Sequence, residues 1–156
     1  NMIECEQDNL KLGYVGKIKK VDTDIVQNFI KSDFIPVIAP IGFGIKGETF
    51  NINGDTAAGA IASSLLADRL LLLTDVVGVK DSEDQLINQL TIEEARSLIG
   101  SGIINSGMIP KVNTSIKAIE EGVRASVIID GRIDHACLLE LFTSHGVGTL
   151  FKKTFD

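Results

Sequence analysis

Apolar and polar residues alternate along the chain with two different periods, which predict strands and helices in turn. Residues 11–21 show the two-residue alternation of a β-hairpin. The segment that begins at Asp22, DTDIVQNFIKSD, places apolar residues at helical spacing and predicts a helix with one apolar face. FIPVIAPI, residues 34–41, is a continuous apolar run that predicts a buried strand, interrupted by Pro36 and closed by Pro40.

The rest of the chain continues this alternation. We predict helices after Gly54 and in the segments TIEEARSLIGSG, GMIPKVNTSIKAIEEG and DHACLLELF, and strands in residues 69–74 and in RASVIID. Thr91 and Glu94 have the spacing of a capping box at the start of the second of these helices. Continuous apolar strands between amphipathic helices indicate an α/β fold with a mainly parallel sheet covered on both faces. Ligands of such sheets bind at the carboxyl ends of the strands.

Length and composition narrow the class of protein. The 156 residues predict one domain, residues 1–156, and the net charge of −6 argues against a general nucleic-acid-binding surface. Cys5 and Cys137 lie too far apart for a metal or redox motif, so we expect two reduced thiols, and without a Cys cluster we predict no metal site. The longest apolar run is too short to span a bilayer, and no signal-peptide pattern opens the chain.

A glycine-rich segment, GFGIKG at residues 42–47, matches two nucleotide motifs only in part. It has the spacing of a dinucleotide fingerprint, but the residues after it predict another extended segment rather than the helix that this motif requires. It also has the glycine spacing of a phosphate loop, but Glu48 stands where the lysine is required. A turn between two strands is the better interpretation.

Polar residues gather before the small-residue helix that follows Gly54. Asn51, Asn53 and Asp55 could simply cap that helix, because Asn and Asp side chains accept hydrogen bonds from free backbone amides. One cap needs one side chain, however, and the alanines that follow would let the helix lie very close to a sheet. We therefore favour a binding or catalytic site here, together with Thr74 and Asp75 at the carboxyl end of a predicted strand.

Lys111 occupies an unusual position for a cation. Pro110 marks the first turn of a helix, so Lys111 lies near the positive end of the helix dipole, which disfavours a cation by about 0.3–1 kcal/mol. A bound anion would reverse this effect, since the dipole, the free amides and the lysine would act together. The alternative is a solvated surface lysine. We predict that Lys111 contacts a phosphate group.

Three segments, NINGDTAAGAIASSLLADRLLLLTDVVGV, SGMIPKVNTSIKAI and LLELFTSHGVGTL, together resemble the N-acetylglutamate kinases of the amino acid kinase family. The resemblance spans the whole chain in order, but only the carboxyl-terminal half of such an enzyme. It implies phosphoryl transfer from MgATP to the side-chain carboxylate of N-acetyl-L-glutamate, in arginine biosynthesis. It also implies a three-layer αβα sandwich whose carboxyl-terminal half binds the nucleotide.

The resemblance also implies roles for individual residues. Asn51 matches an asparagine that contacts acetylglutamate, Asp55 a carboxylate that organises the active-site lysines, and Lys111 the lysine that binds the transferring phosphoryl group. The family's nucleotide-binding segments correspond to Thr74, Asp75, Gly78, Met108 and Pro110. Phosphoryl transfer needs positioning and charge neutralisation and no protein nucleophile, which agrees with these residue types.

Other parts of the family's active site have no counterpart in this sequence. The glycine-rich phosphate loop with its second lysine, the triple-glycine loop and the substrate arginine all belong to the first half of the family, and Ser106 stands where many relatives have glycine. We therefore expect a fragment that lacks the acetylglutamate-binding half and holds about half an active site, and its activity alone stays an open question. Two alternatives stay open: a non-catalytic nucleotide- or arginine-binding regulatory module, and an amino acid kinase for another carboxylate.

The tail, DHACLLELFTSHGVGTL, resembles the arginine-inhibited members of the family. This resemblance makes His135, Glu140 and Gly146 candidates for an arginine site, although Glu140 could also be a solvated helix charge. It further implies a hexamer and, for photosynthetic members, binding of the PII signalling protein. A cytoplasmic or plastid-stromal location suits the expected thiols.

Overall fold

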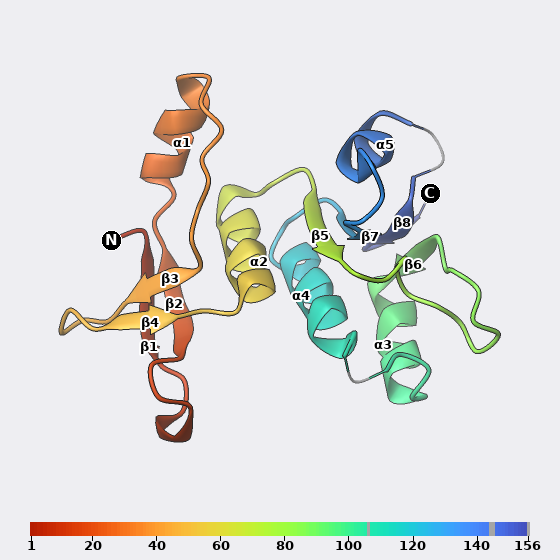
Figure 1. Cartoon of the computed structure of the whole chain (residues 1–156), viewed down its shortest axis with the longest axis horizontal. Coiled ribbons are helices and arrows are strands. Elements are labelled where there is room, and N and C mark those ends of the chain that lie inside the picture. The colour runs from red at the N-terminus through yellow and green to blue at the C-terminus, as the bar shows by residue number, and fades with distance from the viewer. Residues whose placement is uncertain (106, 144–145, 156) are drawn as a thin grey trace. The chain divides into compact units, whose positions relative to one another are not determined.

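A computed structural model describes residues 1–105, 107–143 and 146–155. The chain divides into two compact units, which we call unit 1, Asn1–Leu65, and unit 2, Leu66–Asp156 (Figure 1). Each unit has its own four-stranded sheet and is described by itself. The expectation of one domain over residues 1–156 stays a prediction.

The sheet of unit 1 has the order β2-β1-β3-β4. Its strands are β1 (Ile3–Gln7), β2 (Gly16–Val21), β3 (Ile41–Phe43) and β4 (Thr49–Asn51). β1 and β2 form an antiparallel hairpin, joined through a short 3-10 helix at Leu10–Leu12. The prediction of a hairpin within residues 11–21 is therefore correct only for its second strand, since the first strand is Ile3–Gln7 and residues 11–15 belong to the connection.

Two helices complete unit 1: α1 (Asp24–Lys31) and α2 (Gly54–Leu65). Both were predicted from the sequence. The core consists of buried residues of β1, β4 and α2 with the residue that follows β4, namely Ile3, Cys5, Phe50, Ile52 and Ala57. Ala57 lies in this core, as expected for a helix whose small residues allow close packing on a sheet.

The prediction of a buried strand over residues 34–41 is wrong. Only Ile41 enters a strand, β3, while Ile35 and Val37 are 91% and 97% exposed. Pro36 and Pro40 have no backbone amide to donate to a neighbouring strand. The backbone of residues 34–41 therefore lacks the regular pairing that a buried strand in unit 1 would need. GFGIKG forms the end of β3 and the turn to β4, with Gly47 at φ +87°, which supports the turn interpretation.

The sheet of unit 2 has the order β5-β7-β8-β6. Its strands are β5 (Leu70–Thr74), β6 (Gln89–Thr91), β7 (Ser126–Asp130) and β8 (Gly148–Lys152). β5 pairs with β7 and β6 with β8 in parallel, whereas β7 and β8 are antiparallel. Every residue of β7 is buried, as expected for a central strand covered on both faces.

Three helices cover this sheet: α3 (Ile92–Gly100), α4 (Ile109–Glu120) and α5 (Ala136–Phe142). α4 packs against β7, where the hydroxyls of Ser126 and Ser115 form a buried hydrogen bond of 2.9 Å. Alternate residues of β7, Val127 and Ile129, form a separate cluster with Ala136 of α5. Since side chains alternate across a strand, α4 and α5 cover opposite faces, which gives unit 2 an αβα layering and confirms the α/β class. The expectation of a mainly parallel sheet is wrong, because both sheets combine parallel and antiparallel pairs.

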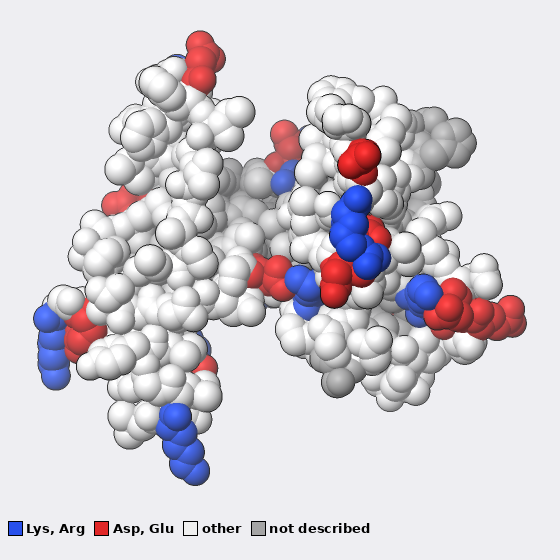
Figure 2. All heavy atoms as spheres, in the orientation of Figure 1, with Lys and Arg blue, Asp and Glu red and all other residues white. Residues whose placement is uncertain are grey.

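Local signals also agree with the structure. The capping box at the start of α3 is present, with both the Thr91 and the Glu94 side chains bonded to backbone amides. Cys5 and Cys137 are free. Within the part of the chain that the structure describes, no helix is long and apolar enough to cross a membrane. On the face that Figure 2 shows, basic and acidic side chains are interspersed.

Candidate functional site

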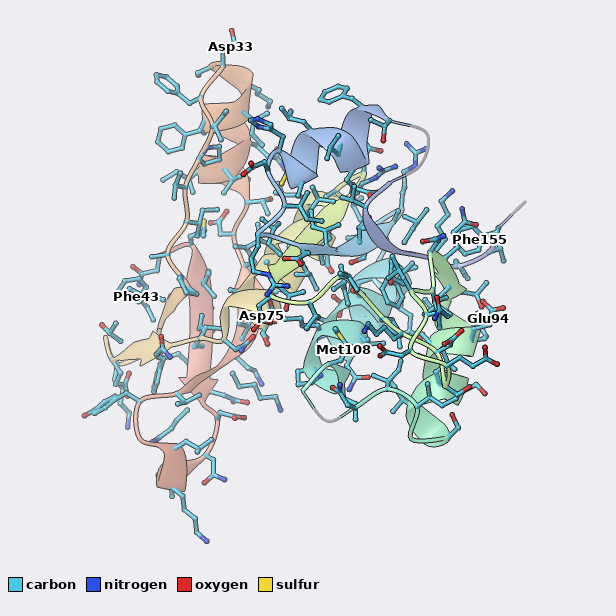
Figure 3. The ribbon with its side chains drawn as sticks, turned by 45° about the vertical axis from the view of Figure 1, so that its right-hand side comes forward. Asp33, Phe43, Asp75, Glu94, Met108 and Phe155 are labelled. Atoms are coloured by element: carbon cyan, nitrogen blue, oxygen red, sulfur yellow. The ribbon has the colours of Figure 1, made fainter. Side chains whose placement is uncertain are left out.

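A pocket of about 490 Å³ lies in unit 2. Five of the sequence-predicted site residues line it, namely Thr74, Asp75, Gly78, Met108 and Lys111. They come from the carboxyl end of β5, the segment after it and the amino-terminal end of α4. Figure 3 labels Asp75 and Met108 on these two sides of the pocket. Pro110, the fifth predicted nucleotide-binding residue, lies in the first turn of α4 and is not among the lining residues.

Backbone pairing fixes the β5 side of the pocket. Thr74 pairs with Asp130 at the end of β7, and its carbonyl accepts a hydrogen bond from the Gly131 amide at 2.8 Å. Gly78 has φ +141°, and a Cβ there would lie 2.6 Å from the Thr149 hydroxyl oxygen. The position therefore requires glycine, and the chain passes close to β8 on its way out of the pocket wall.

The amino-terminal end of α4 forms the facing wall. The Asn105 side chain accepts a hydrogen bond from the Met108 amide at 3.0 Å, which holds the turn that leads into α4. Lys111 is half-buried and lines the pocket, which disfavours its interpretation as a fully solvated surface lysine. The amino-terminal end of the α4 dipole and an ammonium group thus lie at one side of the pocket, an arrangement suited to an anion.

The acidic side chains of the wall have local partners. Lys80 Nζ lies 2.9 and 2.8 Å from the two carboxylate oxygens of Asp84. Asp81 accepts hydrogen bonds at 2.9 Å from the amides of Glu83 and Gln85, which closes a tight turn. The sequence analysis did not single out Lys80, Asp81 or Asp84, because no motif marks this turn as part of a site.

An ion pair lies where β7 ends. Asp130 is only 5% exposed, and both of its carboxylate oxygens accept hydrogen bonds from the Arg132 guanidinium, at 2.9 and 2.8 Å. The Arg132 amide also donates to Asp130 at 2.9 Å. These hydrogen bonds lower the pKa of Asp130 to about 2. Sequence reasoning missed this pair, since its position follows from the pairing of β5 with β7.

Asn51 and Asp55, the predicted substrate-binding and lysine-organising residues, belong to unit 1. Asn51 ends β4, and its amide donates to the Tyr14 carbonyl at 2.8 Å. Asp55 is half-buried in the first turn of α2. Asn53 accepts hydrogen bonds from the Thr56 amide and hydroxyl at 3.0 and 3.3 Å, so this residue acts as the cap. That Asn51 and Asp55 act together with Lys111 stays a prediction.

The candidates in the tail surround α5. Glu140 is 7% exposed, which rules out a solvated helix charge. One of its oxygens accepts a hydrogen bond from the Val147 amide at 3.0 Å, and the other lies 3.6 Å from Arg69 Nη1. Gly146 approaches Glu140 so closely that a Cβ would lie 2.8 Å from the carboxylate. His135 lies exposed just before α5 in a left-handed conformation, with φ 60°.

Two further points of the sequence analysis concern metal binding and Ser106. Among the described residues, no three His, Cys, Asp or Glu side chains are arranged to hold a metal ion. Ser106 lies outside the described residues.

Comparison with known sequences gives a consistent set of relatives. Residues 1–130 match the family described as "Amino acid kinase family". The chain is 54% identical to an acetylglutamate kinase of Dinoroseobacter shibae over 153 residues, which are 98% of this chain and 53% of that protein. It is 51% identical to an acetylglutamate kinase of Paracoccus denitrificans, over 99% of this chain and 51% of that protein. The chain thus spans about half the length of these curated relatives.

Comparison with solved structures agrees on the fold. N-acetylglutamate synthase from Neisseria gonorrhoeae, solved with coenzyme A and L-arginine, superposes with a TM-score of 0.91 and 30% identity, over 99% of this chain and 37% of that one. Carbamate kinase from Giardia lamblia, bound to AMP-PNP, superposes with a TM-score of 0.68 over 90% of this chain and 47% of that one. At 21% identity, the second likeness concerns the fold alone.

Proposed function

The chain belongs to the amino acid kinase family, and we propose that it supplies the nucleotide-binding half of an acetylglutamate kinase. The reaction would transfer a phosphoryl group from MgATP to the side-chain carboxylate of N-acetyl-L-glutamate. The observation that carries the proposal is the pocket between β5 and α4. Its volume falls in the range typical of small-molecule sites, and Lys111 and the amino-terminal end of α4 provide one of its walls.

The chemistry assigned to each residue follows from its position. Lys111, in the first turn of α4, would neutralise charge on the phosphoryl group as it moves between two oxygens. Thr74, Asp75 and Gly78 would contact the nucleotide from the β5 side, and Met108 from the α4 side. In unit 1, Asn51 would contact acetylglutamate and Asp55 would hold active-site lysines in place.

Calorimetric titration with MgADP tests the nucleotide half of the proposal. We expect saturable binding by this chain, and a Lys111→Ala variant that binds about ten- to a hundredfold more weakly, because a charge-assisted contact is lost. Lys117→Ala is the matched control, since Lys117 lies on the same helix but is 71% exposed and lies 3.8 Å from Glu121. Absence of binding by the folded chain, or equal losses in both variants, would refute a nucleotide site at Lys111.

A chimera tests the kinase activity. The half of the Dinoroseobacter shibae acetylglutamate kinase that this chain matches is replaced by this chain, and phosphorylation of N-acetylglutamate is measured. We expect an active chimera and a loss of about 10²-fold or more in kcat with Lys111→Ala. Phosphorylation of a different carboxylate in preference to acetylglutamate would favour the alternative of another amino acid kinase.

An arginine-binding regulatory role is the second candidate. It is supported by Glu140, a buried carboxylate that already lies beside the guanidinium of Arg69, and by the L-arginine complex of the Neisseria gonorrhoeae synthase. Feedback inhibition, a hexameric assembly, binding of PII, and a cytoplasmic or plastid location all stay predictions.

A further inference from the structure

The pocket that we propose for a nucleotide is not a basic cavity. Its lining residues include three carboxylates, Asp75, Asp81 and Asp84, and two ammonium groups, Lys80 and Lys111, so their formal charges leave one negative charge in excess. Lys80 is bound to Asp84, and Lys111 lines the wall at the start of α4. A polyphosphate approaching this wall would be repelled by every further uncompensated carboxylate.

Without its partner Arg132, Asp130 would be such a carboxylate. It pairs in register with Thr74, the residue before Asp75, so the two aspartates leave the sheet at the same edge and on neighbouring strands. Parallel neighbouring strands lie about 4.8 Å apart, and two bare carboxylates at that edge would reinforce each other's field. Within the described residues, the cation bound to Asp130 is Arg132, which is 67% exposed on its side chain and not part of the pocket lining.

The electrostatics agree with this placement. The pKa of Arg132 is raised first by its hydrogen bonds to Asp130, then by the charge of that carboxylate and, least of all, by the charge of Asp75. The charge of Asp75, just after β5, thus acts on the guanidinium in the same direction as that of Asp130, to which the hydrogen bonds are made.

We infer that Arg132 is a positioning residue of the nucleotide pocket, which neutralises the carboxyl ends of β5 and β7 so that a polyphosphate can bind beside Asp75. It does so without touching the ligand, by holding Asp130 in a two-pronged ion pair. The inference rests on the proposed nucleotide site. It states that the charge of Arg132 raises the affinity of the pocket for anions, and that the charge of Asp130 lowers it.

The two partners of the pair therefore give results of opposite sign. We expect Arg132→Met to weaken MgADP binding about three- to tenfold at low salt, since Asp130 is left uncompensated. Asp130→Asn should tighten binding, because it removes a negative charge and keeps a side chain of the same shape. The double variant should return close to the wild-type affinity. A purely structural ion pair predicts weaker binding in all three variants.

Salt gives an independent readout. At an ionic strength of about 0.01 M the Debye length is ~30 Å, and at about 1 M it is ~3 Å, so the deficit of Arg132→Met should nearly vanish at high salt. Arg132→Lys, which keeps the charge, should stay close to wild type. Arg124→Met is the matched control, because Arg124 pairs with Asp68 before β7 begins, with both side chains about four-fifths exposed.

The outcomes separate the two proposals. Binding by wild type that weakens in Lys111→Ala, together with unchanged binding in Arg132→Met, would overturn this inference and leave the nucleotide site standing. A deficit of Arg132→Met that persists at high salt, or weaker binding by Asp130→Asn, would also overturn it. No binding by the folded wild-type chain would overturn both. Circular dichroism of each variant verifies that it is folded.

Discussion

Unit 2 surrounds its central strand with apolar side chains, whereas unit 1 leaves many of its largest apolar side chains in solvent. All five residues of β7 are buried, and α4 and α5 cover its two faces. In unit 1, α1 buries only Val26, and the segment after it exposes Ile35 and Val37 almost completely. The core of unit 1 is a small cluster between β1, β4 and α2.

The difference indicates which unit carries its own stability. Burial of apolar surface is the main favourable contribution to folding, so unit 2 has the means to fold cooperatively. Unit 1 has less core for the backbone that it must order. The chain offers a simple way to observe the two separately. It has no Trp and one Tyr, so the fluorescence of Tyr14 reports on unit 1, while far-UV circular dichroism reports on the helices and strands of both units.

The largest effect that we expect comes from a pair of isoleucines with opposite environments. Ile128→Ala removes a side chain that is 0% exposed in β7 and should lower the free energy of unfolding by about 2–5 kcal/mol. Ile35→Ala changes a side chain that is 91% exposed and should stay within about 0.5 kcal/mol of wild type. Urea unfolding followed by circular dichroism measures both.

A large loss in Ile35→Ala would contradict the comparison, since it would show that the apolar segment of unit 1 is covered in solution, for instance by a second copy of the chain. Sedimentation of the two variants then distinguishes association from folding within one chain. If Tyr14 fluorescence in Ile128→Ala changes at the same urea concentration as the dichroism, the two units unfold together rather than independently.

The same contrast explains what the sequence could predict. Helix α3 was predictable because its signal is local: Thr91 and Glu94 form the capping box, and the apolar residues follow at helical spacing. Residues 34–41 have an equally clear apolar pattern, yet only Ile41 enters a strand. An apolar run specifies that a segment prefers burial, but not what buries it. The pattern predicted that Ile35 and Val37 would be buried in a strand, but both side chains are almost completely exposed.

A smaller effect distinguishes close packing from open space at two glycines. In Gly148→Ala the new methyl group of β8 would lie 2.1 Å from the Ile128 carbonyl oxygen, so the backbone of unit 2 must shift. We expect this shift to lower the free energy of unfolding by about 1–3 kcal/mol. Gly54→Ala adds a methyl group at the start of α2 in unit 1, where nothing lies within 4 Å. That change should be neutral or stabilise by about 0.5–1 kcal/mol. Thermal unfolding measures both, and equal losses would contradict the packing described for β8.

The candidate site was predictable only in part, for a related reason. Thr74, Asp75, Met108 and Lys111 lie in segments whose resemblance to a family is strong, and the structure gathers them around one pocket. Asn105 had a detectable signal, an amide side chain just before a helix. The pair of Asp130 and Arg132 had none, because its meaning depends on the pairing of β5 with β7, across 56 residues of chain. Tertiary pairing of this kind cannot be deduced from spacing along one sequence.

The smallest effect concerns acid, and it compares an ion pair of each unit. The pKa of Asp130 is about 2 in the folded chain, below the value of 3.8 for an ordinary aspartate, because of its hydrogen bonds to Arg132. A lowered folded-state pKa means that the pair stabilises the fold in full above the ordinary value and loses this contribution as the pH falls from 3.8 toward about 2. Asp130→Asn should therefore flatten the pH dependence of the urea midpoint in this window.

The matched pair of unit 1 is Glu6 and Lys19, 3.3 Å apart with both side chains half exposed. Surface pairs of this kind contribute little to stability, so Glu6→Gln should leave the urea midpoint at neutral pH close to that of wild type. Arg132 is exposed, whereas Asp130 is buried. The pH effect therefore measures how much one guanidinium lowers the pKa of a buried carboxylate. Equal profiles for Asp130→Asn and wild type would show that the ion pair is not formed in solution. The charge balance that we infer for the pocket would then lose its basis as well.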